Sequence, residues 1–544
     1  MATIDSNIAS TKLETCIEPI RAVVVTAAVA EPALKSGPPS VALSAGMPTA
    51  SQATALAELA AEAEFWHASD GTAYATIQVD SWREHWRLRS RPFMQWLVRR
   101  YFTAQRAAPY AAALTDALAL LEARARFDGE QRQVFLRVAG HDGHIHLDLA
   151  DRQWRSVVIS PGRWSVVERP PVPFRRAKSM LALPQPRPGG SLTMLRQFIN
   201  VSDDDWPLVA SWLVAALLPT GPYPILFLHG EQGSGKSTQA RVLRSLVDPN
   251  SAPLRAAPRE LRDLALAAHN GWVISLDNLS RLPVWLSDAL CRVSTGGGFA
   301  TRSLKDDEDE SVFDGQRPVL INGIDDLANR GDLLDRALLV HLPAIGPGKR
   351  RTEVEFWREF DECRPLIVGA LIEAAATALA RLPSIALPDL PRLADFAQWA
   401  SAAEPSLGCA PGTIQRLYAR HKVALDRAAL EACPIVEPLF TIVSEGPWRG
   451  TVAQLVRELE QRSGAKERPR RDWPRGFAQL SGLLRRLAPS LRAFGVEVEF
   501  VREGHRGARL IEMRIATAPE KRKTSASSNQ NEAIFPAAKN RTNC

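Results

Sequence analysis

Residues 224–238 read Pro-Ile-Leu-Phe-Leu-His-Gly-Glu-Gln-Gly-Ser-Gly-Lys-Ser-Thr, an apolar run followed by a glycine-rich loop. The loop has the spacing G-x-x-x-x-G-K-[ST], in which backbone N–H groups converge on phosphate oxygens. Glycines permit this tight backbone, and the following helix N-terminus adds a positive dipole. The apolar run predicts a buried strand, and Gln239–Leu246 has a helix-compatible pattern. The stretch therefore predicts a nucleoside-triphosphate site between a strand and a helix.

The side chains of this loop have distinct expected tasks. Lys236 is expected to reach the β- and γ-phosphates, and the Ser237 hydroxyl is expected to bind Mg²⁺. ATP and Mg²⁺ are the expected cofactors. The residues predicted to contact the nucleotide are Gly230, Gly233, Ser234, Gly235, Lys236, Ser237 and Thr238.

Two later apolar runs end in polar residues and predict further strands. The run 272–278 reaches Asp277, whose carboxylate is expected to orient Mg²⁺ through its water shell. The run 318–322 ends in Asn322, whose amide is expected to hold the attacking water or sense the γ-phosphate. A turn-forming asparagine before Gly323 is the alternative interpretation.

Arg336 follows an acidic segment and precedes the apolar run 337–342. It is a candidate arginine finger, which stabilises transition-state charge on a neighbouring subunit's γ-phosphate. A surface ion pair with Asp332 or Asp335 is the alternative. Lys236, Asp277, Asn322 and Arg336 are thus the predicted catalytic residues.

Over residues 192–345 this series of motifs resembles superfamily 3 helicases, and more narrowly the AAA+ primase-helicase ATPases of phages, plasmids and other mobile elements. Residues 295–305 stand where that family carries a hairpin that grips single-stranded DNA in the channel of a ring. Arg302 and Lys305 match its basic residues by position. A glycine-rich loop with incidental charge is the alternative. The resemblance implies a homo-oligomeric ring that uses ATP to translocate on or unwind DNA.

Position 278 departs from the family pattern. Many members carry a second carboxylate there as the general base, whereas Asn278 cannot accept a proton at neutral pH. Asp277 or a nearby acid such as Asp288 would then supply the base, or hydrolysis is slow. The alternative function is a non-translocating ATP-binding switch that assembles on DNA and recruits or loads another factor. A small-molecule kinase is a third candidate, disfavoured by the large flanking domains.

The C-terminal part of the chain concentrates positive charge. Residues 449–514 hold fifteen Lys and Arg against eight Asp and Glu, a surplus of seven, which indicates a nucleic-acid partner. Helices followed by a basic hairpin resemble a winged helix, with Arg485 and Arg486 on the recognition helix and Arg506 in the wing. A protein-docking module is the alternative. The predicted elements are helices 452–462 and 473–491 and strands 496–501 and 510–515.

The N-terminal part predicts a small α+β module with a hairpin around Asp142-Gly143. His144, His146 and Asp148 share one face of a predicted strand. They could share a metal, although a solvent-facing hairpin edge is the preferred interpretation. The module is expected to act as an adaptor or oligomerisation domain.

The overall prediction is a soluble α/β protein with a P-loop AAA+-like ATPase core. An N-terminal α+β module and a C-terminal winged-helix-like domain flank this core. Six scattered cysteines without metal-ligand spacing, and the lack of a long apolar segment near the N-terminus, favour the cytoplasm. DNA and replication proteins are the expected partners, without a membrane. The predicted boundaries are 1–55 disordered arm, 56–190 α+β module, 191–385 ATPase core, 386–440 helical connector, 441–517 basic domain and 518–544 disordered tail.

Overall fold

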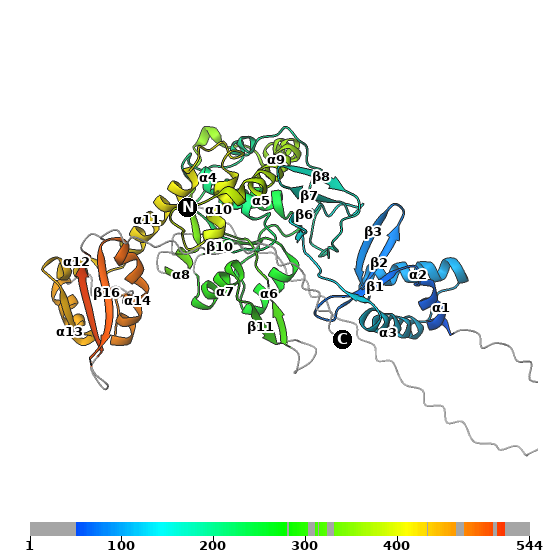
Figure 1. Ribbon diagram of the computed structural model, residues 1–544, viewed down its shortest axis with the longest axis horizontal. Helices are drawn as coiled ribbons and strands as arrows, with labels where there is room; N and C mark the ends of the chain where they lie inside the picture. The colour runs from blue at the N-terminus through cyan, green and yellow to red at the C-terminus, as the bar shows by residue number, and fades with distance from the viewer. Residues whose placement is uncertain are drawn as a thin grey trace, which may run out of the picture. The chain divides into compact units, whose positions relative to one another are not determined.

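The computed structural model describes a mixed α/β protein with several sheets (Figure 1). The described residues are 51–279, 282–302, 310–313, 315–323, 331–431, 433–463, 473–503 and 509–516. The predicted tail and residues 1–50 of the predicted arm lie outside these ranges. The arm was predicted to extend too far, because helix α1 spans Gln52–Leu59 and is capped by the Ser51 hydroxyl. An aromatic-free, alanine-rich sequence gave no sign of this helix.

A parallel sheet of order β10-β13-β9-β14 lies at the centre of the described core. Its apolar strands are buried on both faces. In β9, Ile225 and Phe227 belong to one hydrophobic cluster, whereas Leu226 and Leu228 belong to another. This two-sided burial explains why the strands read as continuous apolar runs instead of alternating ones. The strands are β9 Ile225–His229, β10 Ile274–Leu279, β13 Val319–Gly323 and β14 Ala337–His341, within two residues of the predicted runs.

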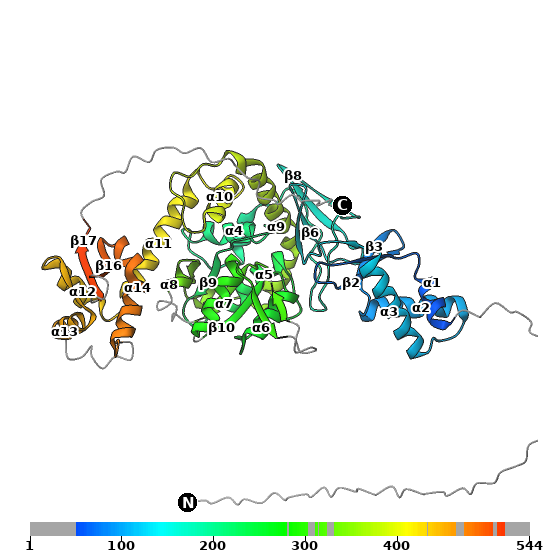
Figure 2. The same ribbon diagram turned by 60° about the horizontal axis from the view of Figure 1, so that its bottom comes forward.

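Helices cover the two faces of this sheet. One cluster contains residues of α4, α9, α10 and the start of α11, which group together in Figure 2. The other contains residues of α6 and α7. The helices are α4 Trp206–Ala215, α5 Lys236–Val247, α6 Leu261–Asn270, α7 Val284–Thr295, α9 Glu353–Arg381, α10 Ala394–Ala403 and α11 Thr413–Glu431.

Two further stretches of helix belong to this core. A 3₁₀ turn, Leu192–Gln197, precedes α4. Helix α9 begins at an N-cap formed by Thr352 and continues through Pro365. Residues 353–384 are apolar and long enough to cross a membrane, but 56% of the most apolar window is buried inside the structure. Its alanines and leucines pack in the core as those of a soluble protein's helix do.

The residues of the predicted N-terminal module are divided among separate hydrophobic clusters. Residues 56–125 form one cluster with a sheet of order β3-β2-β1-β4. Val138, Ile145 and Val157, from a second sheet, instead belong to the cluster of α4 and α9. The elements of the first part are β1 Glu64–His67, β2 Ala73–Val79, β3 Trp82–Arg87, α2 Arg91–Gln105, α3 Ala111–Phe127 and β4 Glu130–Gln131.

The second sheet is an antiparallel meander of order β5-β6-β7-β8. The predicted hairpin is confirmed: Asp142 and Gly143 form its turn with φ of 49° and 76°. Its first strand begins at Val138. The strands are β5 Val138–His141, β6 His144–Asp148, β7 Ser156–Ser160 and β8 Arg163–Val167.

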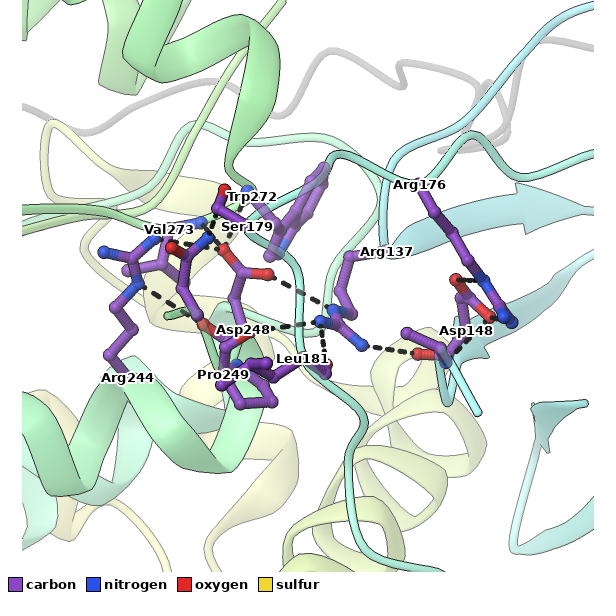
Figure 3. Close-up of polar contacts among 12 residues, drawn as sticks. Arg137, Asp148, Arg176, Ser179, Leu181, Arg244, Asp248, Pro249, Trp272 and Val273 are labelled. Atoms are coloured by element: carbon purple, nitrogen blue, oxygen red, sulfur yellow. Dashed lines mark hydrogen bonds and ion pairs between the residues drawn. The ribbon is translucent and has the colours of Figure 1, made fainter. Parts of the chain in front are cut away.

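A buried ionic network joins this meander to the central sheet (Figure 3). Asp248, the C-cap of α5, accepts hydrogen bonds from the backbone N–H groups of Trp272 and Val273, at 3.0 and 3.1 Å, where β10 begins. Arg137 donates to Asp248 Oδ1 at 3.2 Å, and Arg244 lies 3.6 Å from Oδ2. These three side chains are at most 1% exposed. The network therefore fixes the C-terminal end of α5 against the start of β10.

The C-terminal domain has its own hydrophobic cluster, which spans Leu430 to Met513 and so begins earlier than the predicted 441. Thr451 is the N-cap of the helix that begins at Val452 and forms a full capping box with Gln454. The three-stranded sheet has the order β15-β17-β16. The elements are α12 Val436–Ser444, β15 Trp448–Thr451, α13 Val452–Arg462, α14 Phe477–Ala493, β16 Val496–Arg502 and β17 Arg509–Ile515.

Candidate functional site

The loop after β9 has backbone that requires glycine. Gly230, Gly233 and Gly235 have φ of 149°, 85° and 85°, values that L side chains rarely adopt. Gly235 is the N-cap of α5, so the helix begins at Lys236. Because the first N–H groups of a helix lack intrahelical partners, they point toward the loop as hydrogen-bond donors. The loop therefore has the geometry of an anion cradle.

Lys236 folds back over this cradle. Its Nζ donates to the carbonyl oxygens of Gly230 and Glu231, at 2.6 and 2.8 Å. The side chain is half-buried, and both contacts are to neutral acceptors. A phosphate oxygen would offer the ammonium group a charged acceptor, which makes a stronger hydrogen bond than a carbonyl does.

Polar residues from two neighbouring strands meet the start of α5. The Ser237 hydroxyl donates to Asp277 Oδ1 at 2.9 Å, although the two residues are forty positions apart. A hydroxyl and a carboxylate side by side are oxygen ligands suited to Mg²⁺. The residues present thus fit a magnesium ion held beside the loop.

Asn322 connects β13 to β10 at the same edge. Its Oδ1 accepts a hydrogen bond from the backbone N–H of Asn278 at 2.6 Å. Its Nδ2 is buried and, within the described residues, lacks a hydrogen-bond partner. An unsatisfied buried donor is costly, which is typical of a group reserved for a ligand or an ordered water. The turn-forming alternative does not account for this buried contact.

Asn278 occupies a β-bulge at the end of β10, with φ of 55° and an exposed side chain. Asp288 lies on an exposed position of α7. The sequence reasoning missed a further acid, Asp205, just before α4. Burial raises the pKa of Asp205, an effect opposed by a hydrogen bond from Ser202 and by nearby His229, at the end of β9. Asp205 is thus a further carboxylate next to this edge.

Asn200 is also new to the site. Its amide Nδ2 donates to the carbonyl oxygens of Ser234 and Pro343, at 3.3 and 2.5 Å, and so links the loop to the chain that follows β14. Nothing in the sequence distinguishes this asparagine from an ordinary loop residue.

Arg336 lies away from this cluster. Its carbonyl oxygen accepts from the backbone N–H of Ile225, the first residue of β9, at 2.8 Å. The loop follows the last residue of β9, so Arg336 and the loop are at opposite ends of a strand roughly 13 Å long, at about 3.3 Å per residue. Asp335 forms ion pairs with Arg392 and Lys422. The side chain of Asp332 lies outside the described residues.

The predicted basic hairpin is described only in its strands. β11, Phe299–Arg302, pairs antiparallel with β12, Glu310–Phe313, which confirms a hairpin at this position. Arg302 is the last residue of β11, and its side chain lies outside the described residues, as does the whole of Lys305.

In the C-terminal domain, exposed cations lie on α14. Arg485 and Arg486 are exposed, and the Arg485 guanidinium carbon lies 4.7 Å from the centroid of the Phe500 ring. On the sheet, by contrast, Arg449 and Arg514 are paired with glutamates. Arg506 lies outside the described residues. Exposed arginines without an ion pair also lie on other described elements of the domain, among them Arg457 on the helix 452–462 and Arg502 and Arg509 on the sheet.

The prediction that His144, His146 and Asp148 face the solvent is wrong for two of these residues. His146 and Asp148 are buried, and Arg176 binds the Asp148 carboxylate through two nitrogens, at 2.6 and 3.0 Å. Burial lowers the pKa of His146 to about 4. The described part of the chain contains no group of three or more residues arranged to hold a metal ion. The hairpin was placed correctly, but the ion pair that Arg176 makes with Asp148 from 28 positions away is not visible in a local pattern.

Fold and site together define a mixed α/β protein with a polar, glycine-rich cluster at the carboxyl edge of a parallel sheet. Residues 191–419 match the family model of the actinomycete integrative conjugative element replication protein, and residues 435–530 match that of the AICE RepA C-terminal domain. The central and C-terminal regions are thus similar to a family of mobile-element replication proteins. The expected role in mobile-element replication is thereby supported.

Solved structures with a similar arrangement include two apo structures of the NrS-1 C-terminal region. The alignment with each covers 85% of this chain and 99% of the other, at 10% identity and a TM-score of 0.35. Similarity at this level carries no functional argument. No curated protein matches the chain.

Proposed function

We propose that this protein binds ATP with Mg²⁺ at the loop 230–237 and hydrolyses it to translocate on or unwind DNA during replication of a mobile element. The observation that carries the proposal is the 2.9 Å hydrogen bond between Ser237 and Asp277, next to the Lys236 cradle. Chance glycine-rich turns have no reason to bring a hydroxyl and a distant carboxylate together at a helix N-terminus.

In the proposed mechanism each described residue has a task. The N–H groups at the start of α5 bind phosphate oxygens, and Lys236 exchanges its carbonyl partners for the β- and γ-phosphates. Ser237 and Asp277 hold Mg²⁺, which neutralises the charge that develops on the phosphate oxygens. The free Nδ2 of Asn322 orients the attacking water or contacts the γ-phosphate.

Arg336 is proposed to act between subunits. Arg336 lies at the opposite end of β9 from the loop of its own chain and is too far away to reach that loop. It therefore contributes only if the loop of a neighbouring subunit lies close to it. The proposed role of Arg336 therefore requires the homo-oligomeric form of the proposal. The hairpin β11–β12 and the exposed arginines of α14 are the proposed DNA contacts, with α14 acting as the recognition helix of a winged-helix-like domain.

A non-translocating switch is the second candidate, favoured by the exposed amide of Asn278 at the position of the usual base. ATP turnover, measured with and without single-stranded DNA, separates the two candidates. The motor requires turnover that DNA stimulates in the wild type, with the stimulation lost in Lys305→Ala. Tight ATP binding without turnover, with or without DNA, contradicts the motor and supports the switch.

A further inference from the structure

A segment after β14 runs along the glycine-rich loop. Leu342 donates its backbone N–H to the His229 carbonyl at 2.8 Å, which ties the start of the segment to the loop. A Cβ at Gly230 would collide with the Leu342 carbonyl oxygen, and a Cβ at Gly235 would lie 3.2 Å from Cδ1 of Ile345. Glycines of the loop thus allow residues 342–350 to approach it closely, in addition to allowing its turns.

Arg350 brings a guanidinium group to the middle of the loop. Its Nη2 lies 3.7 Å from the position that a Cβ would occupy at Gly233. The side chain is exposed, and within the described residues the structure gives it no hydrogen bond or ion pair. The neighbouring Arg351, by contrast, is paired with Glu359 at 2.9 Å. Arg350 is therefore an available cation directly beside the loop.

We propose that Arg350 binds the terminal phosphate of a nucleoside triphosphate held by the loop of its own subunit, an inference that rests on the proposed ATP site. The phosphates nearest the nucleoside lie at the N-terminus of α5, which begins at Lys236. Gly233 lies further back, toward Glu231, whose carbonyl already holds the Lys236 ammonium. A cation at Gly233 is thus on the γ-phosphate side of the cradle.

The chemistry of arginine fits this position. Its planar guanidinium offers pairs of N–H donors that match two oxygens of a phosphate group, whereas a lysine offers a point charge. The proposal also separates two roles. Arg350 recognises the triphosphate within one subunit, and Arg336, at the far end of the sheet, acts only across an interface.

The test is equilibrium binding of ATP and of ADP, each with Mg²⁺, to the full chain. Arg350→Ala should weaken ATP binding about tenfold or more, and ADP binding less than about threefold, because only ATP has the contacted phosphate. Lys349→Ala is the matched control, since Lys349 is the adjacent exposed cation of the same segment. It should change neither affinity. Arg350→Lys should fall between the wild type and the alanine variant.

Equal losses for ATP and ADP, or no loss for either, would overturn the assignment of Arg350. Because Arg350 is exposed, thermal unfolding of the variant should match the wild type, which separates lost contact from lost folding. A wild-type chain that binds neither nucleotide would overturn the proposed function itself. A wild type that binds both, with Arg350→Ala indistinguishable from it, would overturn only this inference.

Discussion

The two ends of the central parallel sheet are built for different purposes. At the carboxyl end, Ser237 is exposed and the buried Nδ2 of Asn322 has no partner among the described residues. At the amino end, Asp248 accepts four hydrogen bonds or ion contacts in complete burial, two from backbone and two from arginines. The comparison teaches that the carboxyl end keeps a buried amide donor available for a ligand, whereas the saturated carboxylate at the amino end holds the fold together. Substitutions at the carboxyl end should therefore change ligand binding, and substitutions at the amino end should change the free energy of unfolding.

Arg336 lies at the amino end of the sheet but is proposed to act in catalysis, and its replacement has the largest expected effect. Arg336→Ala should lower the ATP turnover number about 10³-fold or more, as for arginine fingers in general, while ATP affinity stays within about threefold. Turnover and nucleotide binding are measured on the same preparation.

Mixing variants tests the subunit assignment. Lys236→Ala subunits lack a functional cradle but supply Arg336. Arg336→Ala subunits have an intact cradle but lack the arginine. Mixed oligomers should recover part of the activity that each variant lacks alone. No recovery in co-assembled mixtures would contradict action between subunits.

Asp248→Ala should lower the free energy of unfolding by about 3–5 kcal/mol, because it leaves Arg137 and Arg244 buried without their carboxylate. Chemical denaturation measures the change. Arg420→Ala is the matched control, since its ion pair with Asp204 is exposed on both sides and should contribute less than about 1 kcal/mol. A similarly small loss of unfolding free energy in both variants would mean that the Asp248 network at the amino end does not stabilise the fold.

Ser237→Ala should act on binding alone. With Mg²⁺ present, ATP affinity should fall roughly 10- to 100-fold, because one metal ligand and its hydrogen bond to Asp277 are lost. With the metal chelated, wild type and variant should bind alike, and their unfolding free energies should agree. An equal defect with and without Mg²⁺ would show that Ser237 does not hold the metal.

The smallest effect concerns the C-terminal domain, where α14 carries two adjacent exposed arginines without an ion pair among the described residues. The double change of Arg485 and Arg486 to alanine should weaken DNA binding about tenfold and reduce the salt dependence, log K against log salt, by about 2. The matched control is Arg449→Ala, because this arginine is already paired with Glu512 on the sheet. An equal loss of DNA affinity in Arg449→Ala would mean that the DNA-binding surface lies on the sheet instead.

Much of this site could be predicted because its residues are fixed by local chemistry. The loop glycines, Lys236 and Ser237 follow from the spacing of one motif, and Asp277 and Asn322 follow from strands that end at one sheet edge. Buried parallel strands read as apolar runs, so their positions were confirmed within two residues. Helix α13 was predicted to the residue, because its capping box is a local signal.

What could not be predicted depends on contacts between distant segments. The Arg137–Asp248 pair joins residues 111 positions apart, and neither residue has a local pattern that indicates the other. Asn200 and Arg350 reach the loop only because the chain folds back over it. For Arg350 a weak signal exists, since Lys349-Arg350-Arg351 forms a basic run eight residues after the end of β14. The burial of Asp148 was missed because alternation along a strand does not reveal what covers its outer face.

The central claim is that the carboxyl end of the sheet binds ATP with Mg²⁺, and a titration of ATP against the wild type and Lys236→Ala tests it most directly. The account predicts saturable binding to the wild type that weakens when Mg²⁺ is chelated. It also predicts no measurable binding to Lys236→Ala, whose thermal unfolding should be unchanged. Binding of ATP to a folded Lys236→Ala variant with the affinity of the wild type would contradict it.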